Sequence, residues 1–263
     1  MAYQHILFEE KEGVATITLN RPKALNALSD IMMHEIVEVL EKIALNDEVK
    51  VVVLTGAGTA FCSGADLKGG MSDIPDARYL RIKPLGHYTD LMLHIVRLEK
   101  PLIAAVNGHA AGGGFSLALA CDFRIASENA KFTVVQARIG VLPDGGITYL
   151  LPRVVGVARA LELMYTADTI NAREAKEIGL VNRVVPADQF NDEVGKLALR
   201  IARGPSSALE LAKKAVYAAM QTNDIATALA YETWAISVLL RGADMQEGMA
   251  AFLEKRPPKF TGK

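Results

Sequence analysis

The stretch Asn107-Gly-His-Ala-Ala-Gly-Gly-Gly-Phe-Ser-Leu-Ala-Leu-Ala-Cys-Asp122 decides the fold of this chain. The apolar run Leu102–Val106 before it predicts a buried strand, and the Ala- and Leu-rich part after its three consecutive glycines predicts a helix. A strand that breaks at glycines and continues as a helix leaves free backbone N–H groups at the N-terminus of that helix. Glycines let a ligand atom approach the backbone closely, so the turn suits an oxygen that gains negative charge during a reaction.

A second glycine turn strengthens this interpretation. The segment Ala60-Phe-Cys-Ser-Gly-Ala-Asp-Leu67 closely follows another apolar run, Val51–Leu54, which also predicts a buried strand. A sharp turn at Gly64 would direct the N–H of Ala65 toward the space that the N–H of Gly113 faces. Two donors converging on one point form an oxyanion hole. Taken singly, each turn fits ordinary packing better, because glycine turns after strands are common.

The rest of the chain alternates between strand and helix patterns. Val14–Leu19 predicts a strand, and Ser29 or Asp30 is placed to cap a helix. The apolar residues of that helix, at helical spacing, are Ile36, Val39, Leu40 and Ile43. The alternation predicts an α/β fold with a largely parallel sheet. The later part of the chain is mostly helical, which predicts a core over residues 1–186 and a helical oligomerisation region over residues 187–263.

Length, charge and cysteine content limit the classes of protein to consider. The chain has 263 residues, 51% hydrophobic residues and a net charge of −1, which favours a large core and argues against nucleic-acid binding. Cys62 and Cys121 lack disulfide or metal-ligand spacing, which predicts a reducing, cytoplasmic location. No signal peptide is visible, and the glycines and polar residues of Leu102–Cys121 argue against a membrane span. Gly69–Tyr88 lacks clean periodicity and predicts a long mobile loop, the usual place for a lid.

These motifs, in this order, resemble the crotonase superfamily of enoyl-CoA hydratases and isomerases. The residues that carry the resemblance are Asn20–Asn26, Phe61–Leu67, Asn107–Gly114, Cys121–Asp122, Pro143–Gly146, Ala172–Val181 and Glu247–Lys255. It covers nearly the whole chain and implies a spiral core of ββα turns with a helical C-terminal trimerisation region. It also implies an acyl-CoA thioester substrate, whose carbonyl lies between the N–H groups of Ala65 and Gly113. Enolate formation is then the shared step, without a metal or redox cofactor, and coenzyme A is part of the substrate.

Two residues depart from the hydratase pattern. The family's hydratases hold and activate water with two glutamates. One of these positions, two residues after the last glycine of the triplet, is Ser116. The other, found by aligning Phe132 and Gly140 with the family pattern, is Gln136. Neither a neutral hydroxyl nor a neutral amide acts as a carboxylate base near pH 7, so ordinary two-glutamate hydration is not expected.

One carboxylate remains nearby, that of Asp144, where several isomerase branches of the family carry their catalytic base. Independently of the resemblance, Val141 and Leu142 could form an apolar wall that raises the pKa of Asp144. The alternative is a helix N-cap, because Pro143–Gly146 precedes a predicted helix. The resemblance favours the base. A single carboxylate suits an allylic isomerisation, in which it removes a proton from one carbon and returns it two carbons away.

Three further segments indicate a branch within the family. Ile139–Asp144, Leu151–Ala160 and Lys259–Lys263 resemble the ring-opening epoxyphenylacetyl-CoA isomerases of phenylacetate breakdown. A hydratase with rearranged catalytic groups and an inactive acyl-CoA-binding subunit stay open as alternatives. A third, an aryl-CoA dehalogenase with an aspartate nucleophile, is disfavoured. That branch has a tryptophan that would fall at Gln136, whereas the only tryptophan here is Trp234.

The remaining candidate residues divide into binding and structural groups. The residues assigned to substrate binding in the Ala60–Leu67 turn are Cys62, Gly64, Asp66 and Leu67. Phe252 and Lys255 match positions from which a neighbouring subunit of a homotrimer or hexamer holds the CoA nucleotide, although Lys255 equally fits a solvated surface lysine. His109 favours a structural role, and Asp66 and Asp122 favour anchoring turns through backbone hydrogen bonds. Asn171–Glu174 predicts a helix capping box.

Overall fold

The computed structural model describes residues 3–66 and 87–262 of the chain. Its centre is a six-stranded sheet in the order β1-β2-β3-β5-β7-β10. The strands of this main sheet are β1 (Ile6–Lys11), β2 (Val14–Leu19), β3 (Val51–Gly56), β5 (Leu102–Val106), β7 (Phe123–Ser127) and β10 (Arg183–Val185). The pair β1–β2 is an antiparallel hairpin and the other four neighbouring pairs are parallel, as the alternation of strands and helices predicted.

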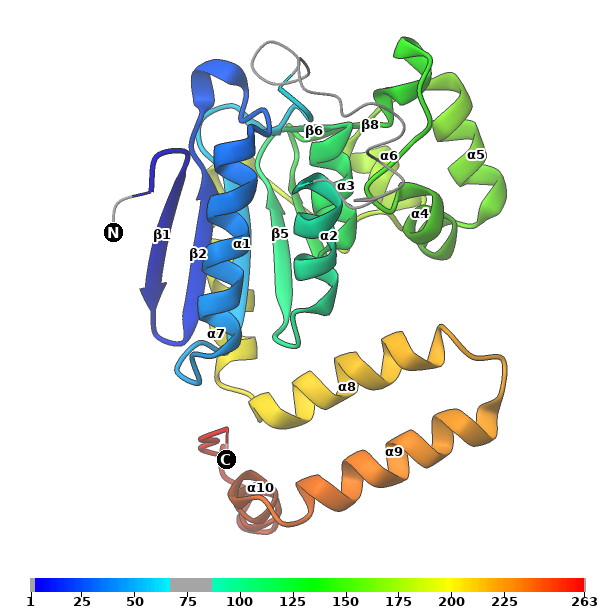
Figure 1. Cartoon of the computed structure of the whole chain (residues 1–263). Helices are drawn as coiled ribbons and strands as arrows, with labels where there is room; N and C mark the ends of the chain where they lie inside the picture. Colours follow the sequence, from blue (N-terminus) through cyan, green and yellow to red (C-terminus); the bar gives the residue numbers. More distant parts are fainter. Residues whose placement is uncertain (1–2, 67–86, 263) are drawn as a thin grey trace.

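Helices cover both faces of the main sheet. The α-helices of the described chain are α1 (Asp30–Ala44), α2 (His87–Arg97), α3 (Gly113–Ala120), α4 (Ile147–Val155), α5 (Val157–Thr166), α6 (Ala172–Glu177), α7 (Phe190–Ala202), α8 (Ser206–Ala219), α9 (Ile225–Leu239) and α10 (Ala243–Glu254). Helices α1, α2 and α3 lie on one face and α7 on the other (Figure 1). In β3, Val52 and Leu54 pack into the core on the first face, whereas Val51 and Val53 pack against α7. A strand covered on both faces reads as a continuous apolar run, which is what the sequence shows here.

A second, smaller sheet lies across the carboxyl ends of the main strands (Figure 1). Its strands are β4 (Ala60–Cys62), β6 (His109–Ala111), β8 (Lys131–Thr133) and β9 (Thr169–Asn171), in that order. Because β6 lies between β5 and α3, the decisive stretch forms a strand–strand–helix unit instead of the strand–turn–helix that the residues alone predicted. A strand of three residues is too short to show the alternation by which strands are recognised.

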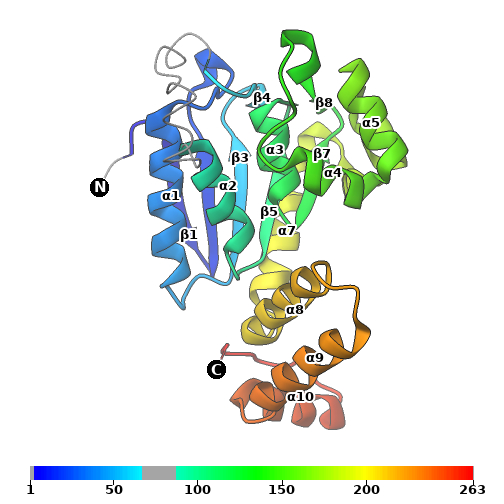
Figure 2. The ribbon, with the colours of Figure 1, turned by 45° about the vertical axis from the view of Figure 1, so that its right-hand side comes forward.

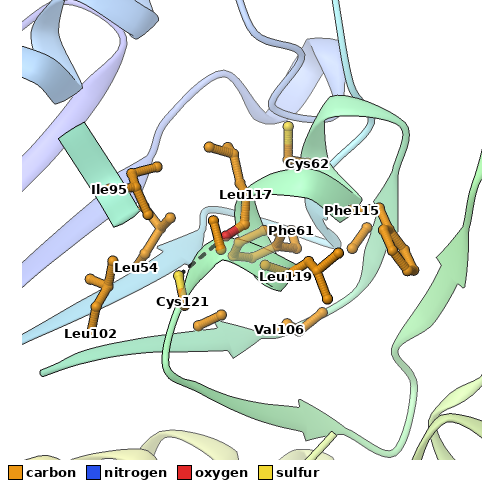
Figure 3. Close-up of a cluster of buried hydrophobic side chains, with 14 of the residues drawn as sticks. Leu54, Phe61, Cys62, Ile95, Leu102, Val106, Phe115, Leu117, Leu119 and Cys121 are labelled. Atoms are coloured by element: carbon orange, nitrogen blue, oxygen red, sulfur yellow. Dashed lines mark hydrogen bonds between the residues drawn. The ribbon is translucent and has the colours of Figure 1, made fainter. Parts of the chain in front are cut away.

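The core beneath α3 is tightly filled. Figure 3 shows Leu117 and Leu119 of α3 packed with Phe61 of β4. The thiol of Cys121 donates a hydrogen bond to the carbonyl of Leu117, 3.2 Å away. Cys62 and Cys121 are both buried and free. The glycine turns at the start of α3 therefore rest on a rigid, well-packed layer.

Local sequence signals explain two of the helix starts. Ser29 caps α1, because its Oγ accepts a hydrogen bond from the backbone N of Met32 at 3.2 Å. The four apolar residues predicted to face the core from this helix are all buried. Asn171 and Glu174 form the predicted capping box at the start of α6, in which each side chain accepts from the other residue's backbone N–H.

The C-terminal part of the chain is helical, and its described residues after Val185 form no strand. Phe190, Val194 and Leu197 of α7 pack against the main sheet. By contrast, α8, α9 and α10 form an arm at the end of the molecule that lies opposite the small sheet (Figures 1 and 2). The division at residue 187 stays a prediction. Among the described helices, none has the length and apolar character needed to cross a bilayer.

Candidate active site

The two glycine turns lie against each other at the small sheet. Gly64, at φ +100°, adopts a backbone conformation that favours glycine, and a Cβ there would lie 3.2 Å from the backbone N of Gly113. The turn is fixed by Leu28, whose N–H donates to the Gly64 carbonyl and whose carbonyl accepts from Asp66. Within the described part of the chain, neither the N–H of Ala65 nor that of Gly113 has an acceptor. Both donors are therefore available to a ligand, as an oxyanion hole requires.

The three glycines at the start of α3 serve different purposes. Gly112 turns the chain with φ +50°. Gly114 lets α3 approach β4, because a Cβ there would lie only 2.1 Å from the Cys62 carbonyl oxygen. Gly113 borders the open side of the turn, where a Cβ would meet Leu28 Cδ1 at 3.0 Å and Tyr88 Oη at 3.4 Å. Only the middle glycine thus faces the space in front of the predicted oxyanion hole.

The residues at the two hydratase-glutamate positions support the turn that carries Asp144. Ser116 is buried, and its hydroxyl contacts the carbonyl of Gly112 at 3.3 Å and that of Asp144 at 3.2 Å. Gln136 lies in the 3₁₀ helix η4 (Val135–Ile139), and its Nε2 donates to Asp144 Oδ1 at 3.1 Å. Its Oε1 is buried and accepts no hydrogen bond from any described residue. Ser116, Gln136 and Asp144, which sequence spacing connected, therefore form one cluster.

The Asp144 side chain does not cap the following helix. The residue at the N-cap position of α4 is Gly146, and only the backbone carbonyl of Asp144 accepts there, from the N–H of Ile147. The carboxylate instead accepts from Gln136 and is exposed. The prediction of an apolar wall around Asp144 is wrong for Val141 and Leu142. These side chains are 51% and 75% exposed, so they do not shield the carboxylate from solvent.

Tyr88 is a site residue that the sequence did not indicate. It is the second residue of α2, and its ring packs against the main core. A Cβ on Gly145 would lie 2.1 Å from its Oη and 2.8 Å from Ser116 Oγ, so the phenol lies beside the turn that carries Asp144. No local pattern marks Tyr88, because α2 is brought to the glycine turns only by tertiary packing.

The other polar candidates have structural partners. Burial raises the pKa of the Cys62 thiol to about 12, so it is a poor nucleophile near neutral pH. Asp66 pairs with Arg21 at 2.8 Å. His109 Nε2 lies 2.8 Å from Thr133 Oγ1, and burial, aided by Lys131 and Arg138, lowers its pKa. A neutral, hydrogen-bonded histidine agrees with the structural role predicted for it.

The structure does not bring the last three binding candidates into this cluster: one falls outside the described residues, and the other two lie far from it. Leu67 and most of the predicted lid, Gly69–Tyr88, fall outside the described residues. Phe252, at the end of α10, is 83% exposed, and Lys255 follows it on the surface. Helix α10 lies at the end of the molecule opposite to the small sheet (Figure 1). One chain therefore does not bring Phe252 and Lys255 to its own glycine turns.

The described surroundings of the cluster contain a cavity and no group of side chains arranged to hold a cation. A largely apolar cavity of about 670 Å³ adjoins Gly145 and Gly146 and continues between α2 and the helices α8 and α9. Among residues 3–66 and 87–262, no group of three or more His, Cys, Asp or Glu side chains is arranged to hold a metal ion. The Asp144 carboxylate and the two free backbone N–H groups, of Ala65 and Gly113, are the polar groups that the sequence predicted for this site.

Comparisons with known proteins agree with this geometry. A family profile described as enoyl-CoA hydratase/isomerase matches residues 9–263. The chain is 42% identical to a crotonyl-CoA hydratase of Syntrophomonas wolfei, over 100% of both chains. It is 40% identical to a 1,2-epoxyphenylacetyl-CoA isomerase of Escherichia coli, over 99% of both chains. Its structure is similar to that of an enoyl-CoA hydratase from Bacillus anthracis, with a TM-score of 0.92, 39% identity, and coverage of 99% of this chain and 100% of that one.

Proposed function

The chain belongs to the enoyl-CoA hydratase/isomerase family, and we propose that within this family it is an acyl-CoA double-bond isomerase with Asp144 as its acid and base. The family acts on acyl-CoA thioesters. One observation carries the choice of isomerisation: the two positions where the hydratases have glutamates hold Ser116 and Gln136, and both side chains contact Asp144. Asp144 is then the carboxylate left for proton transfer.

The proposed reaction moves a double bond by one position. Asp144 takes a proton from C2 of a 3-enoyl-CoA, and the electron pair of that C–H bond delocalises onto the thioester oxygen. The N–H groups of Ala65 and Gly113 stabilise the resulting dienolate. The protonated Asp144 then returns the proton to C4, so the double bond ends between C2 and C3. The reaction needs no activated water, and the proposal invokes no metal or redox cofactor because a base and two donors suffice.

Hydration is the second candidate, because close relatives include a crotonyl-CoA hydratase. The unpartnered Oε1 of Gln136 could accept a hydrogen bond from a water molecule. However, a neutral amide does not remove a proton from that water near pH 7. The Ser116 hydroxyl already lies within hydrogen-bond distance of two carbonyl oxygens, those of Gly112 and Asp144. A hydratase built on this site would have to activate water through Asp144 alone.

A panel of 3-enoyl-, 2-enoyl- and aryl-CoA thioesters with mass-resolved product analysis tests the proposal. Isomerisation leaves the mass unchanged, whereas hydration adds one water. We expect 3-enoyl-CoA isomerisation to exceed 2-enoyl-CoA hydration. Hydration with a kcat of about 10² s⁻¹ or more would overturn the isomerase assignment, because that rate lies well above the ordinary median for enzymes. Binding of the thioesters without any turnover would support an inactive acyl-CoA-binding subunit instead.

We further propose a shared binding site in a homotrimer or hexamer. The support is the distance of α10 from the glycine turns of its own chain, which leaves Phe252 and Lys255 free to reach the CoA nucleotide of a neighbouring subunit. A lysine at that place would pair with the 3′-phosphate. The two free cysteines fit the cytoplasmic location expected from the sequence.

A further inference from the structure

The hydroxyl of Tyr88 is buried without a hydrogen-bond partner among the described residues. Buried polar groups are nearly always paired, because an unpaired hydroxyl loses its bond to water and gains nothing in return. Such an orphan group at a ligand site is commonly explained by a partner that the ligand supplies. Tyr88 meets this condition, since its ring is anchored in the core while its Oη faces the glycine turns.

The position of Oη is defined from two sides. On one side is the start of α3, where a Cβ on Gly113 would lie 3.4 Å from Oη and 3.5 Å from Cε2 of the same ring. On the other side is the Asp144 turn, where a Cβ on Gly145 would lie 2.1 Å from Oη. The phenol therefore borders the space between the predicted oxyanion hole and the proposed base, where the reacting carbons of a bound thioester belong.

The phenol is a neutral donor in this setting. Burial raises the pKa of Tyr88 above its ordinary value, and the nearby Asp144 carboxylate acts in the same direction. The adjoining Ser116 hydroxyl lowers that pKa and is second only to burial in its effect, but its geometry with Tyr88 Oη is not that of a well-formed hydrogen bond. Ser116 is already engaged with the carbonyls of Gly112 and Asp144. The Tyr88 O–H thus keeps its donor capacity for a ligand.

We propose that Tyr88 is a catalytic residue whose hydroxyl donates a third hydrogen bond to the thioester oxygen as that oxygen gains enolate charge. The inference rests on the proposed role of Ala65 and Gly113 as an oxyanion hole. It does not depend on whether the enolate goes on to isomerisation or hydration. A donor that strengthens as charge develops raises kcat more than it lowers KM.

The test compares Tyr88→Phe with the control Tyr165→Phe, which removes the hydroxyl of an exposed tyrosine on α5. The probe is acetoacetyl-CoA, a 1,3-dicarbonyl thioester whose enolate is observed by its near-ultraviolet absorbance. We expect Tyr88→Phe to lower the enolate-to-keto ratio of the bound probe by about 10-fold or more, the scale of a hydrogen bond to a charged group. The ratio in Tyr165→Phe should match that of the unmodified protein.

Turnover and stability provide two further readouts. Tyr88→Phe should lower kcat by about 10²-fold, the scale of losing one oxyanion donor, while KM stays within a few-fold. Its Tm should not fall, because the variant removes an unpaired buried hydroxyl. An unchanged enolate ratio, a lowered Tm, or no enolate enrichment in the unmodified protein would each overturn the inference. If the ratio falls but the protein hydrates rather than isomerises, the role of Tyr88 stands and only the isomerase assignment fails.

Discussion

At the scale of single residues, Asp144 is the side chain on which the proposed mechanism depends. In the variant Asp144→Asn, the amide oxygen still accepts from Gln136 Nε2, and no helix cap is lost because α4 begins at Gly146. The structural cost should therefore be small. The basicity needed for proton transfer is lost, so we expect kcat for isomerisation to fall by about 10² to 10⁴-fold, with thioester affinity within a few-fold. Steady-state kinetics and calorimetric binding of a CoA thioester measure the two effects.

The result for Asp144→Asn decides whether this carboxylate is the catalytic base. A folded variant that keeps more than about a tenth of the original turnover would contradict the role of Asp144 as the base, since loss of a general base costs more than that. Tm measured beside the kinetics shows whether folding is intact. The mechanism would then need another base, and neither Ser116 nor Gln136 is suited to that role.

Gly113→Val tests the space in front of the oxyanion hole. The first added carbon would lie 3.0 Å from Leu28 Cδ1, and the two further methyl groups would enter the region where the thioester oxygen is expected. We expect kcat to fall by about 10²-fold or more, as when one preorganised donor is lost. Gly195→Val is a matched control, because a Cβ at Gly195 of α7 meets no atom within 4 Å. Near-normal turnover in folded Gly113→Val would refute the placement of the hole.

The sequence predicted most of the residues that the structure brings together around Asp144, and its two failures have a common cause. The glycine motifs, Ser116, Gln136 and Asp144 were found because they lie in recognisable segments close along the chain. Tyr88 was missed, and the apolar wall around Asp144 was wrongly expected, because both depend on where side chains point after distant elements have packed. Neighbours in sequence, such as Val141 and Leu142, need not be neighbours in burial.

At the scale of elements, α8 is joined to the core by a buried ionic contact. Lys213 Nζ lies 2.8 Å from Asp122 Oδ2, and the two side chains are only 9% and 14% exposed. Tyr217 of the same helix donates to Asp122 Oδ1 at 3.2 Å. Asp122 also accepts from the N–H of Leu102 at the start of β5, as expected of a residue that anchors a turn. One carboxylate thus holds both β5 and α8.

We expect Lys213→Met to destabilise the fold because it leaves the Asp122 carboxylate buried without its cation. Removing one partner of a buried pair typically costs about 3–5 kcal/mol. The next residue supplies the control: Lys214 pairs with Glu99, but these side chains are 41% and 52% exposed, and an exposed pair contributes about 0–1 kcal/mol. Chemical or thermal unfolding should show a clearly larger loss for Lys213→Met than for Lys214→Met. Equal losses would mean that the Asp122 contact does not stabilise the α8 attachment.

The elements also show where sequence patterns stop being informative. Strands over Val14–Leu19, Val51–Leu54 and Leu102–Val106 were predicted from their sequence patterns, which alternate in the first and are continuously apolar in the other two. The three-residue strands of the small sheet show no period at all. They form because the parallel pairing of β4, β6 and β8 places their backbones side by side, which only long-range contacts determine.

At the scale of the whole molecule, the helical arm presents an apolar surface that one chain leaves uncovered. The residue of α9 that is buried is Ala235. The large apolar residues of α9, α10 and their junction that are about half exposed or more are Ile225, Leu229, Trp234, Ile236, Val238, Leu240, Met249, Phe252 and Leu253. Soluble monomers rarely expose contiguous apolar surface on this scale. We expect sedimentation to show a homotrimer or a hexamer, and a stable, active monomer would contradict this.

A shared site leads to a further prediction, because Lys255 of one chain would then bind the CoA phosphate at the site of a neighbouring chain. Lys255→Ala should raise KM by about 10-fold, equivalent to about 1.4 kcal/mol of lost phosphate binding, and leave kcat nearly unchanged. When Lys255→Ala and Asp144→Asn chains are unfolded, mixed and refolded together, some sites combine an intact Asp144 from one chain with an intact Lys255 from its neighbour. At substrate concentrations below KM, the mixture should then be more active than the two separate variants added together. Activity equal to that simple sum would mean that each chain forms its site alone. This would contradict the shared site inferred from the position of α10, far from the glycine turns of its own chain.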